Sequence, residues 1–445
     1  MSAILRFAPP LAKRLHVGTA RIALVNWLFA RKRGGRLILR LDDTDTSRDA
    51  EAGAETVRQD LRWLGLDWDD SFRQSERLDR YAAAADRLRA AGLLYPCFES
   101  EAELQAKRDQ RVRRGRSPVY DRAMLKLTAE QRARAEAGGK RPYWRFRLSN
   151  ATREWQDLVL GPCHVKLPTL SDPVLVRANG TPLHALTSVV DDLAEGVTHV
   201  VRGEEHVMPT GVQMELMAAL GGDPTRLRFA HLPALTVTGG RKPARGLDEL
   251  SLRSLRQDGI EPEAVAAYLA RIGTKGEAVP ASLAELTAAF GFAGLSPKAS
   301  GFDVAALLRL NRAVLASLPF AAVADRLPPG ATEAFWTAVR GRLDLLAEAR
   351  GYWEIVAGTI IPPVIEGESG FLRTALDLLP PEPWTDTVWT DWTAALASAT
   401  GRAGPALTDP LRLALTGEDD GPEMSGLLPL IGRARTARRL EVAGS

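Results

Sequence analysis

A strand–turn–helix–strand pattern in the first 45 residues constrains the fold of this chain more than any other feature. The segment SAILRFA (2–8) is predicted to form a short strand. After a loop, apolar residues recur at three- and four-residue spacing from Leu15 to Arg33, which predicts a helix. A glycine turn and the apolar strand GGRLILRLDDTD (34–45) follow. This order predicts a βαβ unit, whose parallel sheet places ligands at the carboxyl ends of its strands.

The remainder of the chain divides into an α/β part and a helical part. Residues 49–70 are predicted to form a second amphipathic helix, and residues 100–150 depart from the pattern and are interpreted as an insertion carrying the strand GGKRPYWRFRL. The α/β pattern resumes through the strand VTHVVRGEEH (197–206) and ends near Leu235. Beyond the loop that follows, the chain is predicted to consist only of short helices joined by Pro/Gly turns.

Length, charge and cysteine content set broad limits. A chain of 445 residues is expected to form two or three domains. Two cysteines, Cys97 and Cys163, exclude a disulfide framework, and without a visible secretory signal a cytoplasmic location is expected. The net charge of +3 neither demands nor excludes a polyanionic partner. Two basic runs, Lys107–Arg116 and Arg433–Arg439, suit phosphate-backbone contacts, although a solvated surface explains each run equally well.

The stretch LHVGTAR (15–21) places His16 at the turn between the first strand and the first helix. Free N–H groups and the helix dipole hold phosphate at such a position, and a histidine can donate to a phosphoryl oxygen. Gly18 leaves room for a ligand beside the backbone. Because the motif is short and common, a surface histidine in a βα turn is an equally good interpretation of this stretch alone.

The stretch RLDDTDTSR (40–48) places Asp42, Asp43 and Asp45 just past the carboxyl end of a strand. Carboxylates there can bind an ammonium group or a ribose hydroxyl, or hold Mg²⁺ through water and substrate phosphates. Aspartate is also favoured in turns that precede a helix. Taken alone, the stretch therefore favours a solvated acidic turn.

Two later stretches carry cations at positions that suit the binding of an anionic ligand. Arg202 follows an apolar strand and enters a Gly-acidic turn, where it can grasp a carboxylate bidentately or form an internal ion pair with Glu204, Glu205 or an upstream aspartate. The loop GGRKPARG (239–246) precedes a helix and suits either phosphate binding or an exposed basic hairpin. None of the four stretches is specific alone; their order and spacing are informative.

As a set, these stretches resemble bacterial glutamyl-tRNA synthetases, class I enzymes that join glutamate to tRNA. The resemblance covers nearly the whole chain, and it extends through RQSERLDRY (73–81), YPCFES (95–100), VYDRA (119–123), SDPVLVRANG (171–180) and LRLALTGEDDGPEMSGLLPLIGR (411–433). It implies ATP-dependent attachment of glutamate to tRNA(Glu), tRNA(Gln) or both, through a glutamyl-adenylate. It also implies a monomer that uses ATP with Mg²⁺ and does not bind a membrane.

The resemblance implies a Rossmann-like parallel-sheet catalytic domain with an insertion, followed by an all-α anticodon-binding domain. The implied divisions are 1–95 and 171–235 for the catalytic halves, 96–170 for the tRNA acceptor-binding insertion, 236–310 for a connecting helical region with the signature loop, and 311–445 for the anticodon-binding domain.

Site residues follow from the same resemblance. Those implied in catalysis are His16, Gly18, Lys242 and Arg245. Those implied in ATP binding are Pro9, His16, Gly18, Thr19, Lys242 and Arg245. Those implied in glutamate binding are Arg6, Ala8, Asp42, His184 and Arg202. No metal-ligating residue is implied.

The chain departs from the family pattern at the pocket and the loop. Where the family has Ser-Pro-Thr-Gly, this chain has Pro10, Leu11, Ala12 and Lys13, so a serine hydroxyl is missing. Asp42 replaces a glutamate and His184 a tyrosine. The loop at 242–246 keeps two cations, loses a serine to Ala244 and gains Pro243, which fixes its φ angle.

A zinc site that some relatives carry is not expected here. Cys97 remains, but Glu99 and Met124 occupy positions where cysteines would stand, and one thiol with Tyr120 does not make a zinc site. Cys97 is therefore expected to be buried. The altered positions leave open a paralogue that activates another amino acid, or a non-catalytic tRNA-binding protein. A dehydrogenase is excluded because no G-x-G-x-x-G follows the first strand.

Overall fold

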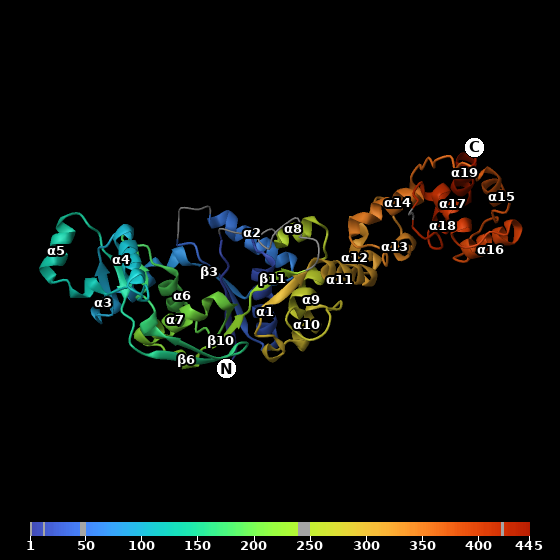
Figure 1. The fold of residues 1–445 in the computed structure, drawn as a ribbon. Helices are drawn as coiled ribbons and strands as arrows, with labels where there is room; N and C mark the ends of the chain where they lie inside the picture. The colour runs from blue at the N-terminus through green and yellow to red at the C-terminus, as the bar shows by residue number, and fades with distance from the viewer. Residues whose placement is uncertain (1, 12–13, 45–49, 239–249, 420–421) are drawn as a thin grey trace. The chain divides into compact units, whose positions relative to one another are not determined.

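The computed structural model describes residues 2–11, 14–44, 50–238, 250–419 and 422–445 (Figure 1). The chain divides into two compact units, Met1–Arg256 with Val265–Val304, and Gln257–Ala264 with Ala305–Ser445. Within the described ranges, no helix has both the length and the apolar composition that crossing a membrane requires.

The predicted βαβ unit is confirmed. Strand β1 (Ile4–Phe7) leads through a loop into α1 (Val17–Lys32), and β2 (Arg36–Leu41) returns parallel to β1, with Ile4 opposite Arg36. Most residues of both strands are buried, as expected when helices cover a parallel sheet. The unit thus brings the ends of β1 and β2 to one edge, beside the start of α1.

A seven-stranded sheet forms the centre of the first unit, in the order β3-β2-β1-β9-β10-β6-β7. The added strands are β3 (Asp70–Arg73), β6 (Thr152–Asp157), β7 (Gly161–Lys166), β9 (His199–Gly203) and β10 (Arg228–Leu232). All neighbours are parallel except the β6–β7 hairpin. The expected mostly parallel α/β class is confirmed, and parallel pairing brings the carboxyl ends of β1, β2 and β9 to the same edge.

The second predicted helix is shorter than expected. Helix α2 ends at Trp63, whereas the prediction ran to residue 70. Gly65 adopts a left-handed φ of 75°, and Leu66 N–H donates to Leu61 O at 2.9 Å, which closes the helix end. The helices up to residue 289 are α1, α2, α3 (Leu78–Ala90), α4 (Glu101–Arg113), α5 (Ala129–Ala137), α6 (His184–Ala194), α7 (Val207–Ala219), α8 (Leu252–Gln257), α9 (Pro262–Arg271) and α10 (Leu283–Ala289).

A second sheet joins the predicted insertion to the chain on either side of it. Strands β4 (Leu94–Cys97), β5 (Tyr143–Phe146) and β8 (Val174–Val176) pair antiparallel, and the strand expected in GGKRPYWRFRL is confirmed as β5. Between β4 and β5 the chain forms α4 and α5, which begin at the reciprocal caps Ser100–Glu103 and Thr128–Gln131. The residue limits of the five domains stay a prediction.

The expectation of helices alone after the basic loop is wrong at one place. Residues Ser300–Asp303 form β12, which pairs parallel with β11 (Leu235–Thr238). Four residues with a single fully buried side chain, Phe302, give no detectable alternation in the sequence. The strand forms because β11 supplies its hydrogen-bond partners and Tyr268 packs against Phe302, with ring centroids 5.1 Å apart.

The second unit is helical, as predicted (Figure 1). Its core includes Trp336 and Trp392, whose indole N–H groups donate to Leu318 O and Ala375 O at 2.8 and 2.9 Å. Helices from residue 304 onward are α11 (Val304–Ser317), α12 (Phe320–Val323), α13 (Glu333–Val339), α14 (Ala349–Ala357), α15 (Ser369–Asp377), α16 (Val388–Thr400), α17 (Pro405–Thr416), α18 (Leu428–Ile431) and α19 (Arg433–Ala443).

Candidate active site

A cavity of about 460 Å³ opens at the carboxyl edge of the parallel sheet, where β1, β2 and β9 end. The structure brings most of the predicted site residues together there. Those lining this one cavity are Arg6, Ala8, Pro9, His16, Thr19, Asp42, His184 and Arg202. Gly18 lies in the first turn of α1, next to this lining. Lys13, Lys242 and Arg245 lie outside the described residues.

The His16 ring folds over the start of α1. Its Nδ1 accepts hydrogen bonds from the N–H groups of Gly18 (3.1 Å) and Thr19 (3.4 Å), and its Nε2 lies 2.9 Å from Thr19 Oγ1. A Cβ at Gly18 would sit 2.9 Å from His16 Cε1, so only glycine leaves room for this ring position. The glycine therefore accommodates the histidine, a role that the sequence did not indicate.

The chain that follows residues 239–249, which include the predicted basic loop and lie outside the described residues, continues beside His16. Val17 N–H donates to Leu250 O, and Leu252 N–H donates to Leu15 O, both at 2.9 Å. Both flanks of residues 239–249 thus belong to the first unit, and one flank pairs with the chain on either side of the predicted phosphate-binding histidine.

Asp42 lies in a dense polar network at the end of β2. Arg40 donates to both of its carboxylate oxygens, at 2.8 and 3.2 Å, and His184 Nδ1 lies 3.1 Å from Oδ2. Burial alone would raise the pKa of Asp42, but attraction to Arg40 and the hydrogen bonds from His184 and Arg40 outweigh it and lower the pKa. Asp42 is therefore an anion whose charge is already partly neutralised.

Arg6, at the end of β1, is held by a buried ion pair. Its Nε donates to Asp192 Oδ1 at 3.0 Å, and both side chains are nearly inaccessible. Asp192 comes from α6, the helix that also begins at His184. The pair fixes α6 against the sheet and leaves Arg6 with its charge balanced by the protein.

Arg202, at the end of β9, differs from Arg6 and Arg40 because it forms no ion pair with a carboxylate of the described residues. Its Nε donates to His231 Nε2 at 3.3 Å and its Nη2 to Thr210 Oγ1 at 2.8 Å. No carboxylate of the described residues lies within 4.0 Å of its guanidinium, so the alternative of a direct ion pair with Glu204 or Glu205 is not realised. Burial and the nearby Arg6 lower the pKa of Arg202 to about 9. Burying a cation without a directly contacting carboxylate is costly, so this guanidinium is suited to contact an anionic ligand.

A neutral histidine completes this wall of the cavity. His206 follows β9, and its ring centroid lies 6.3 Å from that of His184. Burial, together with the charges of Arg202 and His184, lowers the pKa of His206 to about 4. At neutral pH this ring is therefore uncharged and can donate or accept a hydrogen bond without opposing an anion.

Several site residues were missed by sequence reasoning. Arg40 and His206 line the cavity, whereas Asp192, Thr210, His231 and Asp157 lie behind its lining and hold the residues that form it. Arg40 carried one usable signal, because an arginine inside the apolar strand RLILRL must be buried with a partner. His231 and Thr210 gave none, since their contacts join residues that lie far apart in the sequence or on separate elements.

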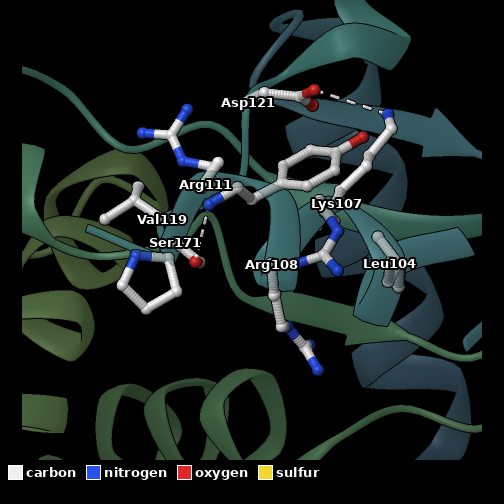
Figure 2. Close-up of a pocket in the computed structure, with 10 residues that line it drawn as sticks. Leu104, Lys107, Arg108, Arg111, Val119, Asp121 and Ser171 are labelled. Carbon is white, nitrogen blue, oxygen red and sulfur yellow. Dashed lines mark hydrogen bonds and ion pairs between the residues drawn. The ribbon is translucent and has the colours of Figure 1, made fainter. Parts of the chain in front are cut away.

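The basic run predicted at Lys107–Arg116 lies mostly on α4. Figure 2 shows a small pocket on this part of the molecule, with Lys107 turned toward Asp121 and with Arg108 and Arg111 on the same helix. Lys107 also pairs with Glu99. The remaining arginines at the end of the run, Arg113, Arg114 and Arg116, are exposed.

In the second basic run, Arg433–Arg439, one arginine is buried. In α19, Arg439 is 3% exposed and donates to Leu415 O at 2.8 Å and to Gly358 O at 3.3 Å. Burial lowers its pKa to about 10. The expectation that Arg433–Arg439 as a whole faces a phosphate backbone is therefore wrong at Arg439, which ties helix ends together.

Cys97 is buried, as predicted, and has no accessible surface. Its Sγ lies 3.7 Å from the Tyr120 hydroxyl, which donates to Glu99 at 2.6 Å. Burial raises the pKa of the thiol to about 11, so it is protonated at neutral pH. Among the described residues no group of three or more His, Cys, Asp and Glu side chains is arranged to hold a metal.

The cavity combines three chemical functions. Arg202 offers a buried positive charge, Asp42 offers a carboxylate, and His16 Nε2 with the Thr19 hydroxyl offers donors for a phosphate. The first two groups are complementary in charge to a zwitterionic amino acid, and the third is complementary to a phosphate. The arrangement suits the joining of a carboxylate to a phosphoryl group.

Comparisons with known proteins agree with this arrangement. The family model described as "tRNA synthetases class I (E and Q), catalytic domain" matches residues 3–308, and the one described as "Anticodon binding domain" matches residues 366–443. A protein of Gluconacetobacter diazotrophicus named glutamate--tRNA ligase 2 is 54% identical, over 99% of both chains. One of the same name from Granulibacter bethesdensis is 56% identical, over 98% of this chain and 97% of its own.

A solved structure shares the fold over its full length. The crystal structure of a glutamate tRNA ligase from Elizabethkingia meningosepticum, in complex with its amino acid, superposes with a TM-score of 0.85 and 23% sequence identity. The match covers 100% of this chain and 99% of that one. The fold of each unit is thus one that is known from experiment.

Proposed function

Because the chain belongs to the class I tRNA synthetases of the E and Q type, we propose that it joins L-glutamate to tRNA through a glutamyl-adenylate made from ATP. The observation that carries the choice of substrate is Arg202, a buried cation with only neutral partners, opposite Asp42 in one cavity. Relatives named for glutamate and tRNA that are 54% and 56% identical over nearly the whole chain support the same reaction.

We infer that the amino acid lies between Arg202 and Asp42. A glutamate carboxylate meets the guanidinium of Arg202, and the ammonium group meets Asp42, which is charged at neutral pH because Arg40 and His184 lower its pKa. Arg6, balanced by Asp192, and Ala8 line the same space. This placement leaves the second carboxylate of the substrate facing the ATP site.

ATP binds next to the start of α1, at Pro9, His16, Gly18 and Thr19. His16 Nδ1 accepts hydrogen bonds from the N–H groups of Gly18 and Thr19, so the ring proton lies on Nε2. This N–H now faces Thr19 Oγ1, and it can donate instead to a phosphoryl oxygen when ATP is bound. Lys242 and Arg245 are proposed to close over the triphosphate; the pairing of Leu250 and Leu252 with the chain beside His16 supports this. Mg²⁺ accompanies ATP as part of the substrate complex.

The chemistry asks the protein for positioning and charge stabilisation. The α-carboxylate of glutamate attacks the α-phosphorus in line, pyrophosphate leaves, and a terminal hydroxyl of the tRNA then takes the acyl group. Cations and N–H groups around the phosphate stabilise the charge that develops on its oxygens. Because no covalent enzyme intermediate is needed, the absence of the family's serine at Pro10 reduces rather than abolishes activity.

The tRNA is expected to contact the insertion and the helical unit. The exposed arginines at the end of α4 suit the acceptor end, and the match of residues 366–443 to an anticodon-binding domain supports recognition of the other end. From the family to which the chain belongs we expect a monomer. Whether tRNA(Glu), tRNA(Gln) or both are charged depends on residues of the helical unit.

The test is aminoacylation with purified tRNA(Glu) and tRNA(Gln) in parallel, with ATP–pyrophosphate exchange measured with and without tRNA. Charging of either tRNA with glutamate is the expected result. A folded protein that exchanges no pyrophosphate with glutamate under any condition would contradict the proposal. Thermal stabilisation by another amino acid would instead favour the paralogue that the changes at Pro10, Asp42 and His184 leave open.

A further inference from the structure

A buried hydrogen-bonded chain runs from β6 through β10 to the cavity. Asp157, the last residue of β6, and His231, in β10, have side chains with no accessible surface, and His231 Nδ1 lies 2.5 Å from Asp157 Oδ2. His231 Nε2 in turn lies 3.3 Å from Arg202 Nε. His231 Nε2 also lies 3.0 Å from Thr210 Oγ1, which accepts from Arg202 Nη2. Neither Asp157 nor His231 lines the cavity, and Arg202 is the residue of the lining that they contact through this chain.

The hydrogen bonds fix which ring nitrogen of His231 carries the proton. Asp157 is an acceptor and Arg202 Nε is a donor, so the proton lies on Nδ1 and the lone pair of Nε2 faces the arginine. Asp157 is itself immobilised, because its Oδ1 accepts from the backbone N–H groups of Val159 (3.0 Å), Leu160 (3.1 Å) and His231 (3.1 Å). Burial lowers the pKa of His231, which is consistent with a neutral ring.

On the basis of the proposed function, we propose that Asp157 and His231 are positioning residues that aim the guanidinium of Arg202 at the carboxylate of the amino-acid substrate. His231 holds Nε and Thr210 holds Nη2, which fixes the plane of the guanidinium. No described residue accepts a hydrogen bond from Nη1, which therefore remains for the ligand.

The neutral ring of His231 separates the carboxylate of Asp157 from the guanidinium of Arg202, and this keeps Arg202 available to the substrate. A carboxylate in direct contact with Arg202 would compete with the substrate for the same N–H groups, as Asp192 occupies Arg6 and Asp42 occupies Arg40. Asp157 fixes the orientation of His231, and His231 in turn holds only Nε of Arg202, so Nη1 stays available for the substrate carboxylate. The outer partners of metal-ligating histidines change metal affinity or activity about 10- to 100-fold when they are replaced, and we expect an effect on the order of the lower end of that range here.

The variant Asp157→Asn tests this role with little change of shape. The three backbone N–H groups keep the amide oxygen on their side, so the NH₂ group faces His231 Nδ1 and moves the ring proton to Nε2. Two donors, His231 Nε2 and Arg202 Nε, then face each other. We expect the KM for glutamate in aminoacylation to rise on the order of 10-fold, with the KM for ATP changed less than about twofold.

Asp172→Asn is the matched control. Asp172 is also buried, at 1% exposed, and accepts from Tyr95, Arg122 and Leu148 N–H, but it does not line the cavity. It should lower the melting temperature and leave the KM for glutamate unchanged. An unchanged KM for glutamate in Asp157→Asn, or an equal rise in both variants, would overturn the proposal.

A second pair of variants covers the case in which Asp157→Asn does not fold. His231→Gln can keep an acceptor toward Arg202 and a donor toward Asp157, whereas His231→Leu keeps neither. We expect the KM for glutamate to rise less in the glutamine variant than in the leucine variant, and equal values at the wild-type level would overturn the proposal. A wild-type protein that charges no glutamate would instead overturn the proposed function itself, and this proposal with it.

Discussion

Two buried arginines on strands of the same sheet, Arg40 and Arg202, make opposite use of their charge. Arg40 is 1% exposed and lies 2.8 Å from Asp42 and 3.5 Å from Asp192, while Arg202 is 7% exposed and contacts only neutral side chains. Burial opposes the charged form of both. At Arg40 the attraction of Asp42 and Asp192 outweighs burial and raises the pKa, whereas at Arg202 burial and Arg6 lower it to about 9.

The difference separates a structural charge from a functional one. An ion pair completed within the protein stabilises the fold and gains little from a ligand. A buried cation without a counter-ion destabilises the fold until an anion arrives, so the free energy lost in folding is recovered in binding. The two arginines are alike in type and burial, and only their partners assign the roles.

The largest expected effect comes from removing each charge in turn. Arg202→Gln should raise the KM for glutamate by about 100-fold or more, because a buried carboxylate–arginine contact is lost, and should leave the free energy of unfolding unchanged or higher. Arg40→Gln should instead lower that free energy by about 3–5 kcal/mol, because it leaves buried carboxylates without their cation. Denaturant unfolding and steady-state aminoacylation measure both. Equal destabilisation by the two variants would contradict the comparison.

A smaller effect is expected at Thr210, which is fully buried and accepts from Arg202 Nη2 at 2.8 Å. Thr210→Val removes this acceptor, and a hydrogen bond to a charged group contributes about 1.5–3 kcal/mol. We expect the KM for glutamate to rise about 10-fold, while Thr210→Ser, which keeps the hydroxyl, stays within about twofold of the wild type. A serine variant as impaired as the valine variant would show that packing, and not the hydroxyl, is responsible.

On the neutralised side of the cavity, His184→Ala should have a modest effect. Asp42 keeps both hydrogen bonds from Arg40 when His184 is removed. The contact that is lost comes from a half-exposed side chain, so solvent screening reduces its contribution to about 1 kcal/mol. The expected rise in the KM for glutamate is about fivefold, and His184→Asn, whose amide can still donate to Asp42, should recover part of it. A rise in the KM for glutamate as large as that of Arg202→Gln would show that the main contact with the substrate lies at His184 and Asp42 and not at Arg202.

The smallest effect is expected at a buried aspartate outside the cavity, one of whose carboxyl oxygens has no hydrogen-bond partner in the described part of the chain, and it concerns stability alone. Asp60 in α2 is 4% exposed, and its Oδ2 has no hydrogen-bond partner among the described residues. Burial raises its pKa to about 6, although Arg256 and the N–H of Leu15 counteract the rise. The folded protein thus holds this proton more tightly than the unfolded chain does, and the group lowers stability as pH rises from about 4 to 6.

Asp60→Asn should therefore raise the melting temperature at pH 7.5 by roughly 2–4 °C for each kcal/mol gained. The gain should shrink toward pH 5, where the wild-type carboxyl is increasingly protonated. Thermal unfolding of both proteins across this range checks the prediction. A variant that is less stable at pH 7.5 would mean that the ionised form of Asp60 contributes to the fold.

The sequence predicted what periodicity and strand order determine. The βαβ start, the parallel sheet and the helical second unit follow from local patterns, and the end of β9 placed Arg202 at the correct edge. The pairing of charges could not be predicted, because His231 and Asp157 are 74 residues apart and meet only through β6–β10 pairing. The short strand β12 was missed for a related reason, since its stability comes from β11 rather than from its own pattern.

The most direct test of the account is calorimetric titration of L-glutamate into the wild type and into Arg202→Gln, with circular dichroism to verify that both are folded. We expect measurable binding to the wild type and at least about 100-fold weaker binding to the variant, because the buried guanidinium is the substrate's counter-ion. Equal affinity of the two folded proteins for glutamate would contradict the central claim that Arg202 is left unpaired in order to hold the substrate.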